Sequence, residues 1–356
     1  MKSEFMDLAL DLARQGAGRT SPNPAVGAVL VQNGVVVGRG FHTWAGVDHA
    51  EIVALAEAGD RARGATVYLT LEPCSHTGRT PPCGDALIRA GVAKVVAAMP
   101  DPNPEVAGRG FERLRTASVE VELAPEYEDE AVRLNEAFVH AMRTGQPLVT
   151  MKAAMSLDGK IAAGHGDTGW ITSEQARAHA QTLRHASDAI VTGIGTVLAD
   201  DPLLTDRTGQ ERSRPLLRIV LDSRLRIPLE SRLVQSAHDD LLVFATSAAD
   251  AASRQALEER GVRVLVSDGG LTALMEYLAN GKYRSVLIEA GAAVNASALE
   301  AGIVDKIFFY YAPKILAGSS SLPVFGREAR ARIERVTLHP IAPDEFAVEG
   351  YVHRNH

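Results

Sequence analysis

Two successive runs of alternating strand and helix patterns, separated by one polar stretch, constrain the fold of this chain most strongly. The first run opens with an apolar helical face at 3–15, followed by AVGAVLVQNGVVVGRG at 25–40, two valine-rich strands around the turn dipeptide Asn33-Gly34. We further expect strands at 66–71, 94–98 and 118–123, and helices from His49 with Asp48 as N-cap, from Cys83, at 105–116 and at 126–142. Such alternation predicts a mixed or mostly parallel sheet covered by helices.

The polar stretch RTGQPLVT at 143–150 is the best candidate for a domain boundary. A chain of 356 residues is too long for one typical core, so we place one domain at 1–145 and a second at 146–356. The second domain repeats the α/β alternation. Its strands are expected at 148–155, 188–193, 217–221, 241–245, 262–266, 284–288 and 305–311, with helices at 173–186 and 271–279.

Composition restricts the class of protein. With 46% hydrophobic and 23% charged residues the chain is typical of soluble globular proteins. The sequence has no apolar run long enough for a bilayer, and MKSEFMDLALDLARQ places acids where a signal peptide needs apolar residues. The chain has two cysteines, too few for a disulfide framework, so we expect a cytoplasmic protein. A net charge of −7 disfavours bulk attraction to nucleic acid.

The two cysteines stand together in LEPCSHTGRTPPCGDALI at 71–88, downstream of an HAE motif at 49–51. A catalytic zinc takes three nitrogen or sulfur ligands and keeps an open position for water, and His49, Cys74 and Cys83 supply such a set. Cys83 is expected to begin a helix, where the backbone N–H groups favour a thiolate. Glu51 is not needed as a ligand, so it can move the protons. H-x-E followed by P-C and a second cysteine is the signature of zinc-dependent nucleobase deaminases.

Other interpretations of these residues stay open. Buried free cysteines are common, and a histidine near a helix start is often only packed. Glu51 could also serve as the capping partner of Asp48. A structural zinc would need a fourth, closing ligand, which His76 could supply, although a position so close to Cys74 is more typical of a pocket lining.

Taken with these motifs, the stretch PNPAVGAV makes the first half resemble the deaminase half of the bifunctional riboflavin-biosynthesis family, diaminohydroxyphosphoribosylaminopyrimidine deaminase / 5-amino-6-(5-phosphoribosylamino)uracil reductase. The eight residues from 75 to 82 between the cysteines, in place of the usual two, are typical of that family. DPNPEVAGRG at 101–110 and SLDGKIA at 156–162 extend the resemblance along the chain. The resemblance implies a cytidine-deaminase-like α/β/α sandwich with one Zn²⁺, followed by an α/β domain similar to dihydrofolate reductase.

By the same resemblance, six residues of the first half hold the pyrimidine and its ribose phosphate. These are Asn23, His42, His76, Arg79, Asp101 and Asn103. An amide suits a base edge and Arg79 suits a phosphate. Each residue also has a simpler interpretation, since SPNP is itself a turn.

Two glycine turns mark the second half. VTGIGTVLADDPLLT at 191–205 and LIEAGAAVNASAL at 287–299 both lead from a strand through glycine into a helix start. Leu198 occupies the third glycine position of G-x-G-x-x-G, so the dinucleotide fingerprint fails, although a helix start with small residues still lets backbone N–H groups approach a phosphate. Two such turns suggest a dinucleotide.

The resemblance makes that dinucleotide NADPH and the second half its reductase. The implied NADPH contacts are Ala154, Trp170, Thr172, Thr196, Asp200, Ser223, Gly291, Ala292, Ala293, Val294, Asn295, Ala296 and Ser297. The implied substrate contacts are Lys152, Thr168, Arg184, Leu204, Arg207 and Glu289. Two arginines suit a phosphomonoester. Trp170 could equally belong to the core, and the arginines to a solvated surface.

The function that the resemblance implies is that of a bifunctional enzyme acting on small phosphorylated pyrimidines, which deaminates first and reduces the ribosyl group second. We also expect a homo-oligomer that binds neither nucleic acid nor membrane. Two rivals remain: a nucleic-acid deaminase, disfavoured by 5% aromatic residues and the negative charge, and a non-enzymatic scaffold with a structural zinc and a nucleotide sensor.

Overall fold

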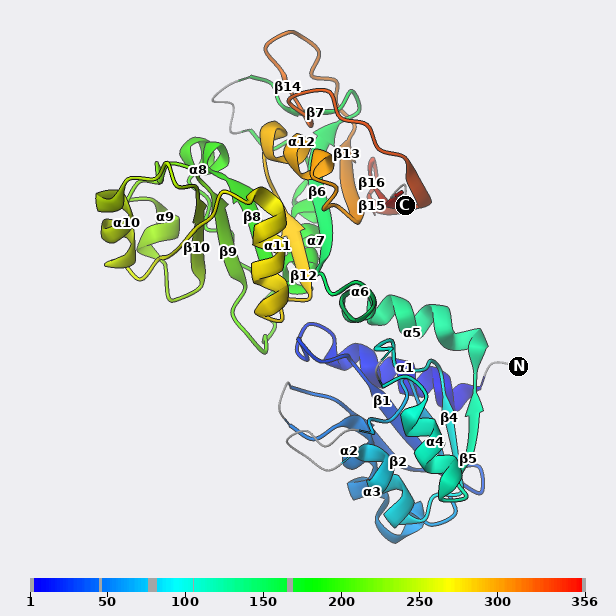
Figure 1. Cartoon of the computed structure of the whole chain (residues 1–356). Helices are drawn as coiled ribbons and strands as arrows, with labels where there is room; N and C mark the ends of the chain where they lie inside the picture. The colour runs from blue at the N-terminus through cyan, green and yellow to red at the C-terminus, as the bar shows by residue number, and fades with distance from the viewer. Residues whose placement is uncertain (1–2, 45–46, 76–81, 105, 165–168, 354–356) are drawn as a thin grey trace. The chain divides into compact units, whose positions relative to one another are not determined.

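The structure, a computed structural model, describes residues 3–44, 47–75, 82–104, 106–164 and 169–353 (Figure 1). The chain forms two compact units. The first comprises Met1–Gly145 with Glu211–Ser213, and the second comprises Gln146–Gln210 with Arg214–His356. The chain leaves the first unit inside the polar stretch RTGQPLVT, and three residues of the expected second domain, 211–213, group with the first unit.

The first unit is built on a mixed five-stranded sheet. Its strands are β1 (Gly27–Gln32), β2 (Val35–Phe41), β3 (Thr66–Leu69), β4 (Lys94–Ala97) and β5 (Glu120–Leu123), in the order β2-β1-β3-β4-β5. The pairs β1–β2 and β1–β3 are antiparallel, whereas β3–β4 and β4–β5 are parallel. The expected hairpin is confirmed: Asn33 and Gly34 both have positive φ, 51° and 75°, as a tight two-residue turn requires.

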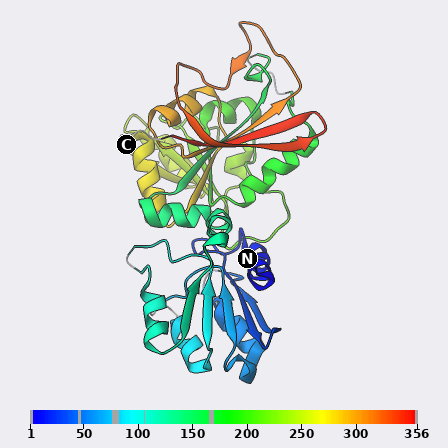
Figure 2. The same ribbon diagram turned by 90° about the vertical axis from the view of Figure 1, so that its right-hand side faces the viewer.

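Helices cover both faces of this sheet (Figure 2). They are α1 (Glu4–Gly16), α2 (Ala50–Ala58), α3 (Cys83–Ala90), α4 (Arg109–Thr116), α5 (Glu128–Leu134) and α6 (Glu136–Thr144), with short 3₁₀ turns at Gly59–Ala62 and Pro125–Tyr127. Alternation along β1 separates two cores. Leu30 packs with α2, α3 and α4 on one face, and Val29 packs with α1 and α6 on the other. The result is an α/β/α sandwich.

Three details of the first unit differ from expectation. The helix expected at 126–142 is interrupted at Asn135, whose side chain hydrogen-bonds the main-chain N and O of Ala25 at 2.7 and 2.9 Å. The helix expected from 105 begins only at Arg109. Asp48 is not the N-cap of α2: His49 holds that position without a side-chain capping bond, since its ring is turned towards the cysteines.

The second unit holds a nine-stranded sheet in the order β11-β10-β9-β8-β12-β6-β13-β16-β15. Its strands are β6 (Leu148–Ser156), β8 (Ala189–Gly193), β9 (Leu217–Leu221), β10 (Leu241–Ala245), β11 (Arg263–Val266), β12 (Ser285–Ile288), β13 (Lys306–Ala312), β15 (Ile333–Ala342) and β16 (Glu345–Val352). From β11 to β13 all neighbours are parallel, and β16 and β15 complete the sheet in antiparallel fashion. A small separate ladder joins β7 (Lys160–Ala162) to β14 (Leu322–Pro323).

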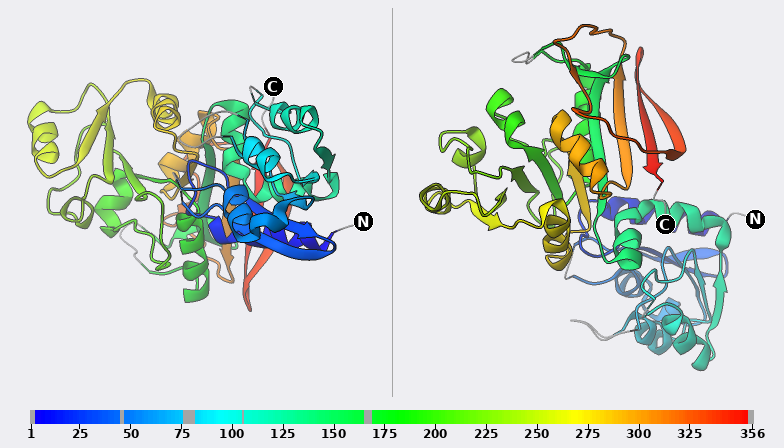
Figure 3. Two further views of the ribbon diagram at one scale, coloured as in Figure 1. Left: turned by 90° about the horizontal axis from the view of Figure 1, so that it is seen from below. Right: turned by 45° about the horizontal axis from the view of Figure 1, so that its top comes forward.

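Six helices flank the large sheet (Figure 3). They are α7 (Glu174–His185), α8 (Ile194–Asp200), α9 (Arg232–Gln235), α10 (Ala251–Glu258), α11 (Gly270–Asn280) and α12 (Ala292–Glu300). Buried residues of α11 and α12 pack against one face, and those of α7, α9 and α10 pack against the other. Within the described residues, no helix combines the length and the apolar character that a membrane crossing requires. Parallel strands place all their carboxyl ends at one edge of the sheet, where the expected site residues gather.

Candidate active sites

The first site lies where α2 and α3 begin. His49 precedes α2, Cys74 follows β3, and Cys83 is the first residue of α3. Their ligand atoms lie within 4.8 Å of one another. The Nδ1 atom of His49 is 3.2 Å from Sγ of Cys83 and 3.7 Å from Sγ of Cys74. The fold therefore brings together the three residues that the sequence motif predicts as metal ligands.

This set fits zinc. Tetrahedral Zn²⁺ with usual bond lengths separates a nitrogen and a sulfur ligand by about 3.6 Å, close to both observed distances. The hydrogen bond between the two thiols pushes their pKa values apart, lowering the pKa of Cys74 to about 4 and raising that of Cys83. The pair thus shares one proton, which a bound metal would displace. Among the described residues the cluster holds three ligands, the number that a catalytic zinc takes from the protein.

Glu51 lies in the first turn of α2, two residues after His49, and is buried at 3% exposure. Burial, together with the nearby Cys74, raises the pKa of Glu51 to about 6. A carboxyl with a pKa near neutrality can both accept and return a proton, which is the behaviour required of a general acid–base.

Two of the expected substrate residues lie beside this cluster. The rings of His42 and His49 are 5.3 Å apart, edge to face. The buried His42 places Nδ1 3.2 Å from the main-chain oxygen of Asp48 and Nε2 3.2 Å from Nδ2 of Asn23. Burial lowers the pKa of His42, which favours a neutral ring that donates from Nδ1 and accepts from the Asn23 amide at Nε2.

The loop that carries Asp101 and Asn103 is held by a residue that sequence analysis missed. Glu72 is buried, and its carboxylate accepts hydrogen bonds from main-chain N–H groups of this loop and of α4. A carboxylate at the end of an apolar strand, directly before Pro73-Cys74, was the signal available in the sequence. His76 and Arg79 lie outside the described residues, so their expected roles remain predictions.

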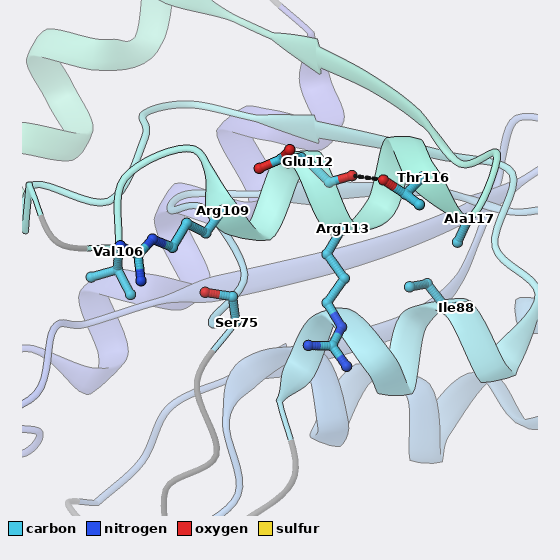
Figure 4. A pocket seen from close by; sticks show the side chains of 8 residues that line it. All are labelled: Ser75, Ile88, Val106, Arg109, Glu112, Arg113, Thr116 and Ala117. Atoms are coloured by element: carbon cyan, nitrogen blue, oxygen red, sulfur yellow. Dashed lines mark hydrogen bonds between the residues drawn. The ribbon is translucent and has the colours of Figure 1, made fainter.

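A hollow of about 700 Å³ opens between α3 and α4 (Figure 4). It is lined by Ser75, Ile88, Val106, Arg109, Glu112, Arg113, Thr116 and Ala117. Ser75 adjoins a metal ligand, but none of the three ligands is among the described residues that line the hollow, and we assign it no role in the chemistry.

Replacing Cys83 by serine should remove most of the zinc from the purified chain, because an alcohol is a far weaker zinc ligand than a thiolate. The first unit should also lose stability, since metal binding contributes to folding. Metal analysis of the purified protein measures the first effect and thermal unfolding measures the second. The control is His42→Gln, which alters the neighbouring ring but no ligand and should leave about one zinc per chain. Full occupancy in Cys83→Ser would exclude the site.

The second site gathers around Glu289. The register of β12 and β6 pairs Ile288 with Met151, so the next residues, Glu289 and Lys152, lie side by side. The Glu289 carboxylate is 3.6 Å from Nζ of Lys152 and accepts two 2.8 Å hydrogen bonds from Nε and Nη2 of Arg184 on α7. Burial alone would raise the pKa of Glu289, but Lys152 and Arg184 lower it to about 2.

Two aromatic residues near this cluster were not foreseen. Tyr310 on β13 is buried, and its ring centre lies 5.8 Å from Nζ of Lys152. Its hydroxyl donates to Nδ1 of His179 at 2.7 Å, and burial lowers the pKa of that histidine, which favours a neutral acceptor. No sequence pattern marked Tyr310, because IFFYYA at 307–312 looks like any buried strand.

The two glycine turns lie together. They follow β8 and β12, which are neighbours in the sheet. A Cβ on Gly291 would lie 3.8 Å from Oγ1 of Thr196, and one on Gly193 would lie 2.7 Å from Val294, so glycine is required at the latter. The helix starts of α8 and α12 therefore adjoin. The Oδ1 atom of the buried Asn295, in α12, has no hydrogen-bond partner within the described part of the chain. Two adjacent helix N-termini, each preceded by a glycine that leaves room for a ligand, suit the binding of a dinucleotide phosphate.

The other expected contacts belong to several elements of the second unit. Ala154 lies in β6, Thr172 is buried before α7, Asp200 ends α8, and Ser223 follows β9; Ala292, Ala293, Ala296 and Ser297 belong to α12. Trp170 is 71% exposed beneath the Arg177 guanidinium at 4.6 Å, so the alternative that it belongs to the core is wrong.

The expected substrate contacts on the 201–210 segment are less uniform. The Leu204 side chain is packed in the core, at a φ of 53°, so any contact it makes with a ligand must come from its main chain. Arg207 is exposed, and its main-chain N–H donates to Gln181. Thr168 lies outside the described residues.

Comparison with known families identifies both halves. The family model described as cytidine and deoxycytidylate deaminase zinc-binding region matches residues 1–99, and the model described as RibD C-terminal domain matches residues 147–344. The riboflavin biosynthesis protein RibD of Escherichia coli K12 is 45% identical over 330 residues, covering 89% of this chain and 89% of that protein. That of Actinobacillus pleuropneumoniae is 44% identical over 351 residues, covering 97% and 93%.

Solved structures agree over the whole chain. The RibD of Acinetobacter baumannii in its form 1 superposes with a TM-score of 0.90 at 38% identity, covering 98% of each chain. A diaminohydroxyphosphoribosylaminopyrimidine deaminase/5-amino-6-(5-phosphoribosylamino)uracil reductase of Thermotoga maritima gives 0.83 at 33% identity, again covering 98% of each chain.

Proposed function

Because the chain belongs to the RibD family of riboflavin-biosynthesis enzymes, with a zinc-dependent deaminase and an NADPH-dependent reductase activity, we propose that each activity resides in one of its two units. The substrate of the first is 2,5-diamino-6-(5-phosphoribosylamino)pyrimidin-4(3H)-one, and that of the second is the resulting 5-amino-6-(5-phosphoribosylamino)uracil. Two observations carry the proposal. One unit holds a His-Cys-Cys cluster and a buried Glu51, and the other holds a Lys152–Glu289–Arg184 cluster, with side chains 11–16% exposed, together with two glycine turns.

In the first unit, the residues of the chain hold the substrate and move protons. His49, Cys74 and Cys83 would hold the zinc, which would supply an activated water. Glu51 is placed to accept a proton and to return it to the exocyclic nitrogen, so that ammonia leaves and a carbonyl replaces the amine. The Asn23–His42 pair supports this role: it lies beside His49, and its amide can pair with a base edge.

In the second unit, the reaction opens the ribosyl ring. The two glycine turns would hold NADPH, which would supply the hydride for C1′. As the C1′–O4′ bond breaks, O4′ needs a proton, and we assign its delivery to the ammonium group of Lys152. Glu289 keeps that ammonium in place, and Arg184 keeps Glu289 in place. Tyr310 offers its ring face to the same ammonium group.

A cytoplasmic location and a homo-oligomer are also part of the proposal. The outermost strand β15 exposes Val336 and Leu338, at 55% and 64%, and a second copy of the chain would cover such side chains. Sedimentation of the purified chain measures the oligomeric state, and fractionation of cells measures the location.

The function is tested by following two products separately. The purified zinc-loaded chain is supplied with the diamino-pyrimidinone phosphate, and ammonia release is measured without NADPH. The uracil intermediate is then supplied with NADPH, whose absorbance reports reduction. Both signals are expected, and the absence of either would remove that activity from the proposal.

Arg184→Ala should raise the KM for the phosphorylated uracil intermediate by roughly ten- to a hundredfold, if each charge-assisted bond to phosphate contributes about 1.5–3 kcal/mol. The prediction rests on the family resemblance, whereas the structure gives the guanidinium to Glu289 and to the main-chain oxygen of Thr205. NADPH affinity should barely change. The variant should also discriminate poorly between the phosphorylated intermediate and its dephosphorylated analogue. Unchanged discrimination with a lower kcat would instead restrict Arg184 to holding Glu289.

A further inference from the structure

Glu72 occupies an unusual place for a carboxylate. It lies beyond the end of β3, two residues before the metal ligand Cys74, and is only 5% exposed. It makes no ion pair with a lysine or arginine of the described chain. Four main-chain N–H groups donate to its carboxylate, from Asp101 at 3.0 Å, Gly108 at 2.9 Å, Gly110 at 2.8 Å and Phe111 at 3.3 Å.

Three of these four donors belong to the start of α4. The helix begins at Arg109, and its N-cap is Gly108, which has no side chain to accept the first N–H groups. The carboxylate of Glu72, which is distant from α4 in the sequence, accepts these hydrogen bonds in place of a capping side chain. A negative charge is also favoured there by the helix dipole, which offsets the cost of burying it.

The fourth donor belongs to the loop that carries the expected substrate residues. Asp101 N–H bonds to Glu72, and the side chain of Asp101 accepts from Asn103 N–H at 2.8 Å. On the other side, a Cβ on Gly110 would lie 2.2 Å from the main-chain oxygen of Pro73, so α4 packs directly on the strand end. The Glu72 carboxylate thus connects the segment that carries Cys74 to the loop that carries Asp101 and Asn103.

We propose that Glu72 is a positioning residue of the deaminase: its charge holds Asp101 and Asn103 at the distance from the metal ligands that substrate binding requires. The inference rests on the proposed function of the first unit. Glu72 does not touch the substrate, and it acts through the loop.

The test separates positioning from simple support of the fold. Glu72→Gln keeps the shape but removes the charge. If Glu72 positions the loop, the KM for the diamino-pyrimidinone phosphate should rise at least about tenfold, with zinc content and uracil reduction unchanged, because binding is lost before chemistry. If Glu72 only supported the fold, zinc content and apparent kcat would fall together, while the KM of the surviving enzyme stayed constant.

A matched control lies on the same helix. Glu112 is exposed on α4, and the bond drawn there in Figure 4 runs from the Thr116 hydroxyl to the main-chain oxygen of Glu112, not to its carboxylate. Glu112→Gln removes the same charge from α4 without touching the loop and should leave KM within about twofold of the unaltered chain.

A double-mutant cycle with Asn103→Ala decides whether the effect passes through the loop. All measurements use the full-length, zinc-loaded chain. If Glu72 acts through Asn103, the effects on KM should be clearly less than additive, since one change already misplaces what the other removes. Additive effects, or a KM that stays constant in Glu72→Gln, would overturn the inference. A chain without substitutions that releases no ammonia would instead contradict the proposed function.

Discussion

Glu51→Ala should lower the rate of ammonia release by roughly a thousand- to ten-thousandfold, near the upper limit for loss of a general acid–base group. The expectation follows from the position of Glu51, which lies beside the ligand cluster without belonging to it, and whose pKa of about 6 suits both proton transfers. Zinc should stay near one per chain. Reduction of supplied uracil intermediate should be unaffected, because that chemistry is assigned to the other unit.

The control for this substitution is Glu57→Ala on the same helix. Glu57 lies at the exposed side of α2 and pairs with Arg39, so its loss should leave ammonia release nearly unchanged. If Glu51→Ala also stops reduction of the supplied intermediate, the assignment of one activity to each unit is wrong. If it keeps ammonia release, a different group moves the protons.

The sequence was most informative where the local pattern alone determines structure. The Asn33-Gly34 hairpin, the parallel strands and the helix that begins at Cys83 each depend on short-range turn chemistry or on apolar periodicity. The strands β15 and β16 were missed, because Val336 and Leu338 of β15 are exposed and the buried positions of β16 include Glu345 and Ala347 rather than large apolar residues. The break at Asn135 depends on Ala25, which is distant in sequence, so no local pattern contains it.

The same distinction applies to the sites. The three candidate zinc ligands and Glu51 were recognisable because metal chemistry restricts residue type and spacing. Glu72 was not, because its partners are main-chain N–H groups, which leave no mark on residue identity. Lys152, Arg184 and Glu289 were each expected as substrate contacts from family resemblance, whereas their contacts with one another become visible only once β6, β12 and α7 are placed in space.

Glu289→Gln should abolish most of the reductase activity, by roughly a hundredfold or more if proton delivery by Lys152 is lost. The amide keeps the shape of Glu289 but removes the negative charge that Lys152 and Arg184 share, and their side chains are only 16% and 13% exposed. Uncompensated buried charge of this kind costs about 3–5 kcal/mol of unfolding free energy. The exposed pair of Glu300 with Arg327 provides the control: Glu300→Gln should cost less than about 1 kcal/mol and leave reduction intact.

The pH dependence of stability distinguishes the ion pair from a packing effect at Glu289. Its pKa falls from an ordinary 4.5 to about 2 in the folded chain, so its contribution is complete above pH 4.5 and is lost as the pH falls towards 2. The glutamine variant has no such group to titrate. Urea unfolding of both chains, monitored in the second unit, should therefore show a stability gap that is constant near neutrality and narrows below pH 4.5. A gap of the same size at pH 7 and pH 3 would mean that Glu289 stabilises by shape alone, and the role assigned to Lys152 would lose its electrostatic support.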